Sequence, residues 1–267
     1  MILAVLNEII GLPENASEHA AMADLMLEIV HWFMLVLGVG WSIFIGVAIW
    51  KFRESKQEKA DYHGVVGHLS THVEVAVVLA EAILLLGFAF PLWKMRSEEY
   101  PTGPDVVRVR AIGYQFGWQF HYPGEDKVFG RTHHRFLSGS NPLGQDLEDP
   151  AGTDDMVATG VLRLPVGRKI IIDITSKDVI HNLALVPMRM AQDAIPGTRS
   201  TVWFTPNKTG EWDIICGQLC GASHAEMVAT LEVMPEDEFF AWNSEASGEA
   251  YAARQIEKAS EPVADLK

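Results

Sequence analysis

The stretch CGQLCGASHAEM, at residues 216–227, gathers four metal-binding side chains within twelve positions. Cys216 and Cys220 supply thiols, His224 supplies an imidazole and Met227 supplies a thioether. Thiolate and thioether ligands select copper over hard cations, and imidazole suits copper as well. The stretch therefore predicts a copper site.

A second histidine should complete this site, and His181 is the best candidate. It follows the strand-like run 169–175, so a β-scaffold could deliver it from a distant loop. Two other interpretations of the cysteine pair remain open. A disulfide is possible in an oxidising compartment, but it has no use for the adjacent histidine and methionine. Zinc accepts cysteine and histidine, but this spacing is unusual for a zinc finger and methionine is a poor zinc ligand.

The pattern Cys-x3-Cys-x3-His-x2-Met, preceded by Asp178-Val-Ile-His181, resembles the dinuclear copper A motif of cytochrome c oxidase subunit II. A mononuclear blue-copper site has a single cysteine, whereas two thiolates can bridge two metals. The resemblance implies an electron relay with two bridging thiolates, two capping imidazoles and two weak axial ligands. The bridging thiolates would be Cys216 and Cys220, and the capping imidazoles would be His181 and His224. The weak axial ligands would be Met227 and the backbone carbonyl of Gln218.

Two long apolar segments, 25–50 and 75–93, are each long enough to cross a bilayer as a helix. The loop between them carries four basic residues and the leading segment 1–24 has none, so the positive-inside rule places the loop in the cytoplasm and both termini outside. A buried pair of core helices is the alternative. We expect a two-helix transmembrane hairpin over 25–97 that packs against a larger membrane subunit. Segment 1–24 would be extracytoplasmic, either an already mature start or a short interfacial helix.

Short β-branched or aromatic runs alternate with turn residues over 98–234, which predicts a β-sandwich. A Greek-key sandwich with a copper loop between its last two strands resembles a cupredoxin domain. The expected fold class is therefore an α+β membrane protein, with two N-terminal transmembrane helices followed by a cupredoxin-like β-sandwich. Residues 123–155 interrupt the pattern as a long surface excursion, in which we expect His133 and His134 to be an exposed loop pair. Residues 235–267 should form a surface helix followed by a disordered end.

Two acidic residues lie on one face of the second apolar helix, Glu74 near its start and Glu81 seven residues later. Intramembrane acids are usually functional. The resemblance implies that Glu74 opens a proton uptake path of the catalytic subunit, and an interfacial carboxylate without function is the alternative. For Glu81 we expect a polar contact with a partner helix.

Three features depart from the common pattern of the family. Gln218 replaces the acid that helps to bind magnesium or manganese at the interface with the catalytic subunit, which puts magnesium binding in doubt. In the family, electrons enter at a Trp-x-Trp run beneath docked cytochrome c; here the first tryptophan is replaced by Phe116, and Trp118 matches the second. Asp178 matches a family carboxylate near the donor surface. The chain has no Cys-x-x-Cys-His motif, so it carries no covalently attached haem and its electrons must come from another protein.

The resemblance implies the subunit through which electrons enter a membrane haem-copper oxygen reductase, a proton-translocating cytochrome c oxidase whose oxygen chemistry takes place in a partner subunit. The expected partners are catalytic subunit I, the lipid bilayer and a cytochrome c type donor, either soluble or held in a quinol-oxidising complex; no nucleic acid is expected. A net charge of −14 favours a basic donor. We expect a bacterial-type cytoplasmic (inner) membrane, with the copper domain extracytoplasmic.

Two alternative functions remain. A copper-free structural subunit of a quinol oxidase would have no need of the cysteines. The copper A domain of another terminal reductase, such as nitrous oxide reductase, would share the loop but would lack the two membrane spans. The combination of spans and loop favours the oxygen reductase, because the cupredoxin fold alone hosts many roles.

Overall fold

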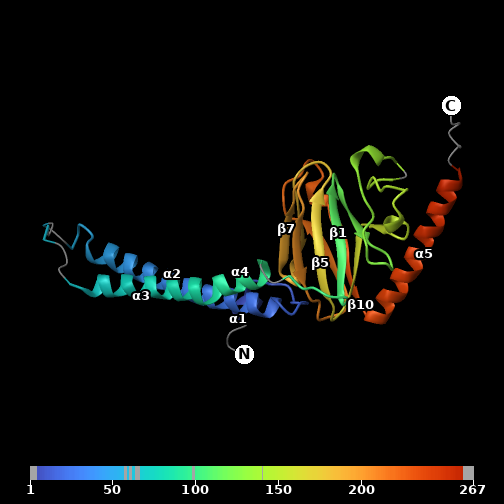
Figure 1. Cartoon of the computed structure of the whole chain (residues 1–267). Coiled ribbons are helices and arrows are strands. Elements are labelled where there is room, and N and C mark those ends of the chain that lie inside the picture. Colours follow the sequence, from blue (N-terminus) through green and yellow to red (C-terminus); the bar gives the residue numbers. More distant parts are fainter. Residues whose placement is uncertain are drawn as a thin grey trace. The chain divides into compact units, whose positions relative to one another are not determined.

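The computed structural model describes residues 5–56, 59, 62–63, 67–97, 100–139 and 141–260. The chain forms two compact units, one of residues 1–13 and 21–99 and the other of residues 14–20 and 100–267. The first is helical, and the second is built mainly of strands (Figure 1). Two N-terminal apolar helices followed by a β-sandwich confirm the predicted fold class.

Two long helices make up most of the helical unit. Its elements are α1 (Val5–Ile9), α2 (Ala20–Lys51), α3 (Leu69–Leu84), the π-helical η2 (Leu85–Ala89) and α4 (Phe90–Ser97), of which the last three run on as one helix. Both long helices are apolar enough to cross a membrane, and none of the residues in their apolar windows is buried inside the chain. A core helix of a soluble protein would be mostly buried, so this exposure argues against the alternative of a buried helix pair.

The short helix α1 is tied to α2 by the carboxylate of Glu28, which is fully buried. Glu28 accepts hydrogen bonds from the backbone N–H groups of Leu6 at 3.0 Å and Asn7 at 2.8 Å, and from Trp32 Nε1 at 2.9 Å. A buried carboxylate needs such partners, because its transfer out of water is otherwise very costly. Segment 1–24 thus contains a short helix that is docked on α2.

Ten strands in the described part of the chain form two five-stranded sheets, with the orders β3-β2-β1-β5-β8 and β4-β10-β9-β6-β7. Most neighbours are antiparallel, but β1 pairs with β5 and β4 with β10 in parallel. The strand bounds are β1 (Val106–Tyr114), β2 (Gly117–Tyr122), β3 (Met156–Thr159), β4 (Val161–Pro165), β5 (Lys169–Ser176), β6 (His181–Leu185), β7 (Met190–Ala194), β8 (Ser200–Phe204), β9 (Gly210–Cys216) and β10 (Val228–Met234).

The core lies between the two sheets, where alternate residues of each strand point inward. In β1, Val109 and Ala111 are fully buried, whereas Arg108 is exposed and Arg110 is only partly buried. This is the period of two expected for a strand with one face on the core. All six residues of β2 are buried, which indicates that its outer face is covered as well.

The excursion 123–155 is joined to β2 by a buried polar cluster. His121 Nε2 lies 2.6 Å from Asp155 Oδ2, and the Gln145 side chain contacts the same imidazole nitrogen at 3.3 Å. Burial lowers the pKa of His121, against the opposing effect of Asp155. Arg254 donates to Gln145 Oε1 at 2.8 Å and to the Asp155 carbonyl at 3.2 Å. The excursion is thus attached both to the sheet and to the C-terminal helix.

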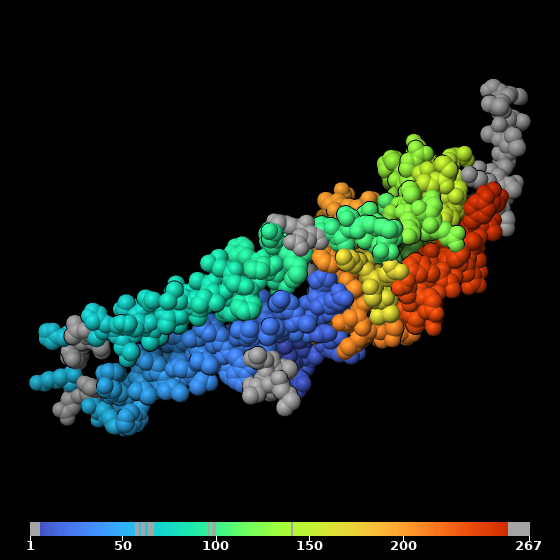
Figure 2. All heavy atoms as spheres, turned by 60° about the horizontal axis from the view of Figure 1, so that its bottom comes forward, coloured from blue at the N-terminus to red at the C-terminus, as the bar shows by residue number. Residues whose placement is uncertain are grey.

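The C-terminal helix α5 (Glu236–Ser260) is exposed along much of its described surface and buries one face. It continues well past Asn243, and Ser247 and Arg254 are buried rather than exposed. Figure 2 shows this helix in red against the yellow-green excursion. The excursion supplies partners for this buried face, which no local pattern in the tail could reveal. Residues 261–267, where a disordered end is expected, lie outside the described part of the chain.

Candidate metal centre

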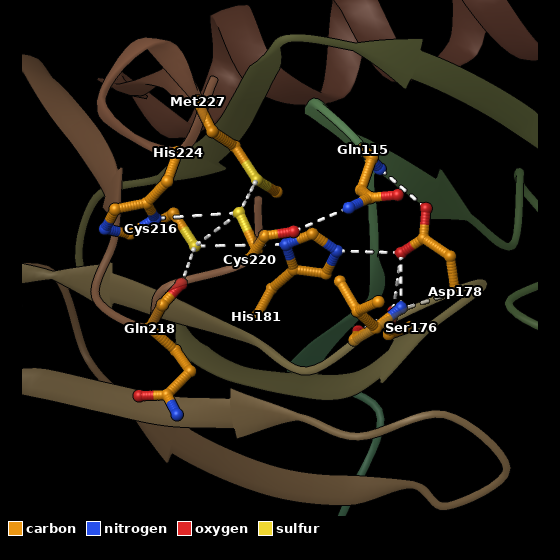
Figure 3. A network of polar contacts seen from close by, with 10 residues as sticks. Gln115, Ser176, Asp178, His181, Cys216, Gln218, Cys220, His224 and Met227 are labelled. Atoms are coloured by element: carbon orange, nitrogen blue, oxygen red, sulfur yellow. Dashed lines mark hydrogen bonds and ion pairs between the residues drawn. The ribbon is translucent and has the colours of Figure 1, made fainter. Parts of the chain in front are cut away.

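The predicted metal loop connects β9 to β10 and lies beside the start of β6 (Figure 3). Cys216 is the last residue of β9 and His181 is the first residue of β6. These strands pair with Leu183 opposite Cys216, and the Gly217 N–H donates to the Asn182 carbonyl at 3.0 Å. Strand register therefore brings the histidine to the thiol across a long sequence separation.

The two thiols and the two imidazoles form a contiguous group. The Sγ atoms of Cys216 and Cys220 are 3.9 Å apart. His181 Nδ1 lies 3.9 Å from Cys216 Sγ, and His224 Nδ1 lies 3.6 Å from Cys220 Sγ. Figure 3 shows the imidazoles on opposite sides of the sulfur pair. Each thiol therefore has its own imidazole neighbour.

Two weaker donors complete the group. Met227 Sδ lies 3.7 Å from Cys220 Sγ, and the Gln218 carbonyl oxygen lies 3.2 Å from Cys216 Sγ. Met227 is placed by the backbone, because its carbonyl accepts the Cys216 N–H at 3.2 Å. All six donors that the resemblance implies are thus brought to one place, and they are soft or borderline ligands, which suit copper.

Both cysteines are free thiols and are buried. Burial and the adjacent Cys216 raise the pKa of the Cys220 thiol to about 11. Without a metal, this thiol is therefore protonated at neutral pH, and a bound cation would have to displace the proton. A disulfide would require the sulfurs to be about 2.05 Å apart, and they are not.

The carboxylate of Asp178 holds the His181 ring in place. Its Oδ1 accepts from His181 Nε2 at 2.9 Å and from the Val179 N–H at 2.7 Å. Burial would raise the pKa of Asp178, but hydrogen bonds from His181, the Gln115 N–H and the Val179 N–H outweigh it and lower the pKa. Because Nε2 carries the shared proton, the Nδ1 lone pair is left facing Cys216.

Gln115 links the two halves of the centre, and sequence reasoning missed it. Its backbone N–H donates to Asp178 Oδ2 at 2.7 Å, and its side-chain Nε2 donates to the Cys220 carbonyl at 2.6 Å. It thus joins the carboxylate that orients one imidazole to the loop that carries the second thiol. Its position directly before Phe116 gave no signal, because an isolated glutamine in a β-rich stretch has no characteristic spacing.

Gly113 and Trp118 form the inner wall of the centre. A Cβ at Gly113 would lie 2.9 Å from Cδ2 of His181 and 3.2 Å from a ring carbon of Trp118, so only glycine fits. The Trp118 ring is fully buried and stands edge-on to the His181 ring, with the centroids 6.0 Å apart. Trp118 therefore cannot touch a docked protein directly.

Phe116 is at the surface, where 38% of its area is exposed. It lies close to the loop, since a Cβ at Gly221 would lie 2.9 Å from its ring. Leu219 at the loop tip is 78% exposed, and Val179 and Ile180, just before His181, are also exposed. These four apolar residues, Phe116, Val179, Ile180 and Leu219, come from the segments around the centre, and we call them the apolar rim.

The remaining predicted residues lie outside the centre. The Gln218 side chain is exposed and points away from the sulfur atoms in Figure 3. Glu74 and Glu81 are exposed on α3, in the helical unit. His133 and His134 are exposed, with ring centroids 4.2 Å apart. Within the described residues, one group of His, Cys, Asp or Glu is close enough to hold a metal: His181, Cys216 and Cys220, whose ligand atoms all lie within 4.8 Å of one another. His133 and His134 do not belong to it.

The fold and the site together define a cupredoxin-like domain with a group of soft donors that could hold a metal, carried on a chain with two apolar helices. Comparison with known proteins agrees with this class. Residues 107–234 match the family described as cytochrome c oxidase subunit II, periplasmic domain. The alternative cytochrome c oxidase subunit 2 of Bradyrhizobium diazoefficiens is 30% identical over 82% of this chain and 78% of its own length. Cytochrome c oxidase subunit 2 of Cereibacter sphaeroides is 27% identical over 93% and 86%.

A crystal structure of the periplasmic domain of a Bradyrhizobium japonicum subunit II is 28% identical, covers 57% of this chain and 99% of its own, and has a TM-score of 0.41. The chain belongs to the cytochrome c oxidase subunit II family. It is thus a subunit of a haem-copper oxidase, an oxidoreductase complex, and a membrane protein with an extracytoplasmic domain. The predicted family is confirmed.

Proposed function

We propose that the sandwich holds a dinuclear copper A centre through which electrons enter the oxidase. Cys216 and Cys220 would bridge the two coppers, and His181 and His224 would each cap one. Met227 and the Gln218 carbonyl would be weak axial ligands. The observation that carries this proposal is the pairing of each imidazole with a different thiol. A tetrahedral zinc site has no role for a thioether, and Met227 lies within the group.

When bound, such a centre takes up and gives up one electron at a time. The chain contributes a scaffold that needs little rearrangement, because the ligands stand at strand ends and in a loop bonded to its neighbours. Asp178 keeps His181 in one tautomer, and Gln115 ties this carboxylate to the loop. Burial of the thiols keeps water away from them. These features favour a relay over a site of bond-making chemistry.

The electron donor in this proposal is a cytochrome c type protein, either soluble or held in a quinol-oxidising complex, and the acceptor is the haem of catalytic subunit I. The complex would reside in a bacterial-type inner membrane. The apolar rim has the composition of an interface core, and Asp178 adds partly exposed negative charge beside it. With a net charge of −14, the chain should attract a basic donor.

We expect reduction of the assembled oxidase by a soluble cytochrome c to slow steeply as ionic strength rises, because salt screens the attraction. Leu219→Ser should slow this reduction at every ionic strength, since it removes an exposed apolar contact without touching a ligand. Stopped-flow absorbance measures the rate, and copper content is measured alongside it.

Tyr251→Ser on α5 is the matched control for Leu219→Ser, because it removes an exposed apolar side chain away from the rim. Slow reduction together with stable co-purification of a quinol-oxidising complex would identify a bound donor. Direct reduction by quinol alone would overturn the proposed donor class.

We propose that magnesium or manganese, if bound at the interface with the catalytic subunit, is held loosely because Gln218 offers an amide in place of a carboxylate. Hard divalent cations prefer charged oxygen ligands. Gln218→Glu should therefore tighten manganese binding, as measured by electron paramagnetic resonance titration of the complex. Gln255→Glu on α5 adds the same charge elsewhere. Equal affinities of the wild-type and Gln218→Glu complexes would show that this side chain is not a ligand.

We propose that Glu74 admits protons from the cytoplasmic side to the catalytic subunit. Glu74→Ala should then slow steady-state oxygen consumption, while reduction of copper by the donor stays unchanged. Glu81→Ala, on the same face of α3, is the matched control. Turnover of Glu74→Ala equal to that of the wild type across a range of pH would leave Glu74 as an ordinary interfacial acid.

A further inference from the structure

A basic pocket lies on the outer face of the sheet that contains β1. Its volume is about 390 Å³, and its walls come from β1, the excursion and the turn before β8. Arg110 reaches it because the neighbours Val109 and Ala111 point into the core. The titratable residues that line the pocket are Arg110, Arg131, Arg135, Arg199, His133 and Asp146.

This concentration of positive charge is unexpected in a chain with 35 acidic and 21 basic residues. Among the described residues, Arg110, Arg135 and Arg199 make no ion pair. The single acid of the lining, Asp146, is taken by Arg131, with Nη2 3.0 Å from Oδ2. Three of the four arginines of the lining are therefore without an ion-pair partner in the described part of the chain.

Arg110 is the most buried arginine of the pocket, and its guanidinium is poorly supplied with acceptors. Its Nε is buried and has no hydrogen-bond partner among the residues that the structure describes, and its guanidinium lies 3.9 Å from the centroid of the Phe129 ring. Burial and the charge of Arg199 lower the pKa of Arg110 to about 10. The nearest carboxylate on the adjacent strand, Asp173, is occupied by Arg108 at 3.0 Å and Thr201 at 2.8 Å. A buried donor without a partner is costly, so a ligand that accepts from it would stabilise the fold.

We propose that this pocket binds an oxyanion of the phosphate class. Guanidinium groups form a fork of donors that matches phosphate oxygens, and such charge-assisted hydrogen bonds are about twice as strong as neutral ones. The volume lies within the range of small-molecule sites, roughly 300–1,000 Å³. Phe129 and Phe136 give the pocket apolar walls. A bound anion would join three segments that are distant in the sequence.

The experiment uses the full chain in detergent and sodium pyrophosphate as the probe, with sodium chloride at equal ionic strength as the reference. We expect calorimetry to detect saturable pyrophosphate binding. Arg199→Gln and Arg135→Gln should each weaken pyrophosphate binding about tenfold or more, because each removes one charged hydrogen bond. Both side chains are exposed, so neither change should disturb folding. Hydrogen exchange should show protection of residues 129–136 on binding.

Lys208→Gln is the matched control, since it removes one positive charge from an exposed site outside the pocket and should leave the affinity unchanged. Equal effects of chloride and pyrophosphate, or affinities of Arg199→Gln and Arg135→Gln equal to that of the wild type, would overturn the proposal. Repeating the titration in phosphatidylcholine nanodiscs with and without phosphatidic acid separates two possible sources of the phosphate group, a lipid and a soluble compound. Competition by phosphatidic acid would identify a lipid headgroup, and the lack of competition would identify a soluble phosphate compound.

Discussion

Cys216→Ser and Cys220→Ser are each expected to abolish the proposed dinuclear copper centre, whereas Met227→Leu should retain both coppers. Each thiol has an imidazole beside it, and in the proposed centre both thiolates would be needed to hold the two metals, so the loss of either should release them. The Met227 thioether lies 3.7 Å from Cys220 Sγ, and a weak axial thioether tunes a copper site without holding it. Copper analysis combined with electron paramagnetic resonance measures the result.

The same spectra test the alternatives for the cysteine pair. A two-copper signal that persisted in Cys216→Ser would refute the bridging role. Met227→Leu serves as the control for folding, because it changes a buried side chain of the same loop while leaving both thiols in place. A colourless wild-type protein that bound zinc in preference to copper would overturn the proposed centre.

Asp178→Asn is expected to weaken copper binding by about 10–100-fold, the range seen when a partner of a metal-bound histidine is lost. An amide can present its NH2 group to His181 Nε2 and favour the wrong tautomer, which would place a proton on Nδ1, the atom that faces Cys216. Competition with a chelator of known affinity measures the change. Because the Gln115 N–H also donates to Asp178, the loop should loosen as well.

Asp193→Asn is the matched control for Asp178→Asn. Asp193 accepts at 2.7 Å from the Nδ2 of Asn182, the residue that follows His181. In the described part of the chain it has no hydrogen bond to a predicted ligand. Both changes remove one negative charge from the same end of the sandwich. If the two variants bound copper equally well, Asp178 would have only a structural role.

The sequence alone predicted the membrane spans, the sandwich and the donors of the loop, because these depend on local order. Apolar length determines whether a helix can cross a bilayer, and alternation with turn residues predicts short strands. Five of the six donors are within twelve positions, so any loop that turns back on itself brings them close. The choice of His181 required more, namely the resemblance and a strand-like run before it.

Tertiary structure decided everything that depends on register and on contacts between distant segments. The pairing of β6 with β9 places His181 beside Cys216, and the turn after β1 places Gln115 between Asp178 and the Cys220 carbonyl. The burial of Trp118 and the attachment of α5 to the excursion likewise depend on which surfaces meet. The basic pocket is the clearest case, since its arginines come from three separate segments. The physical reason is that hydrogen bonds, burial and charge act through space, whereas sequence patterns report only the neighbours along the chain.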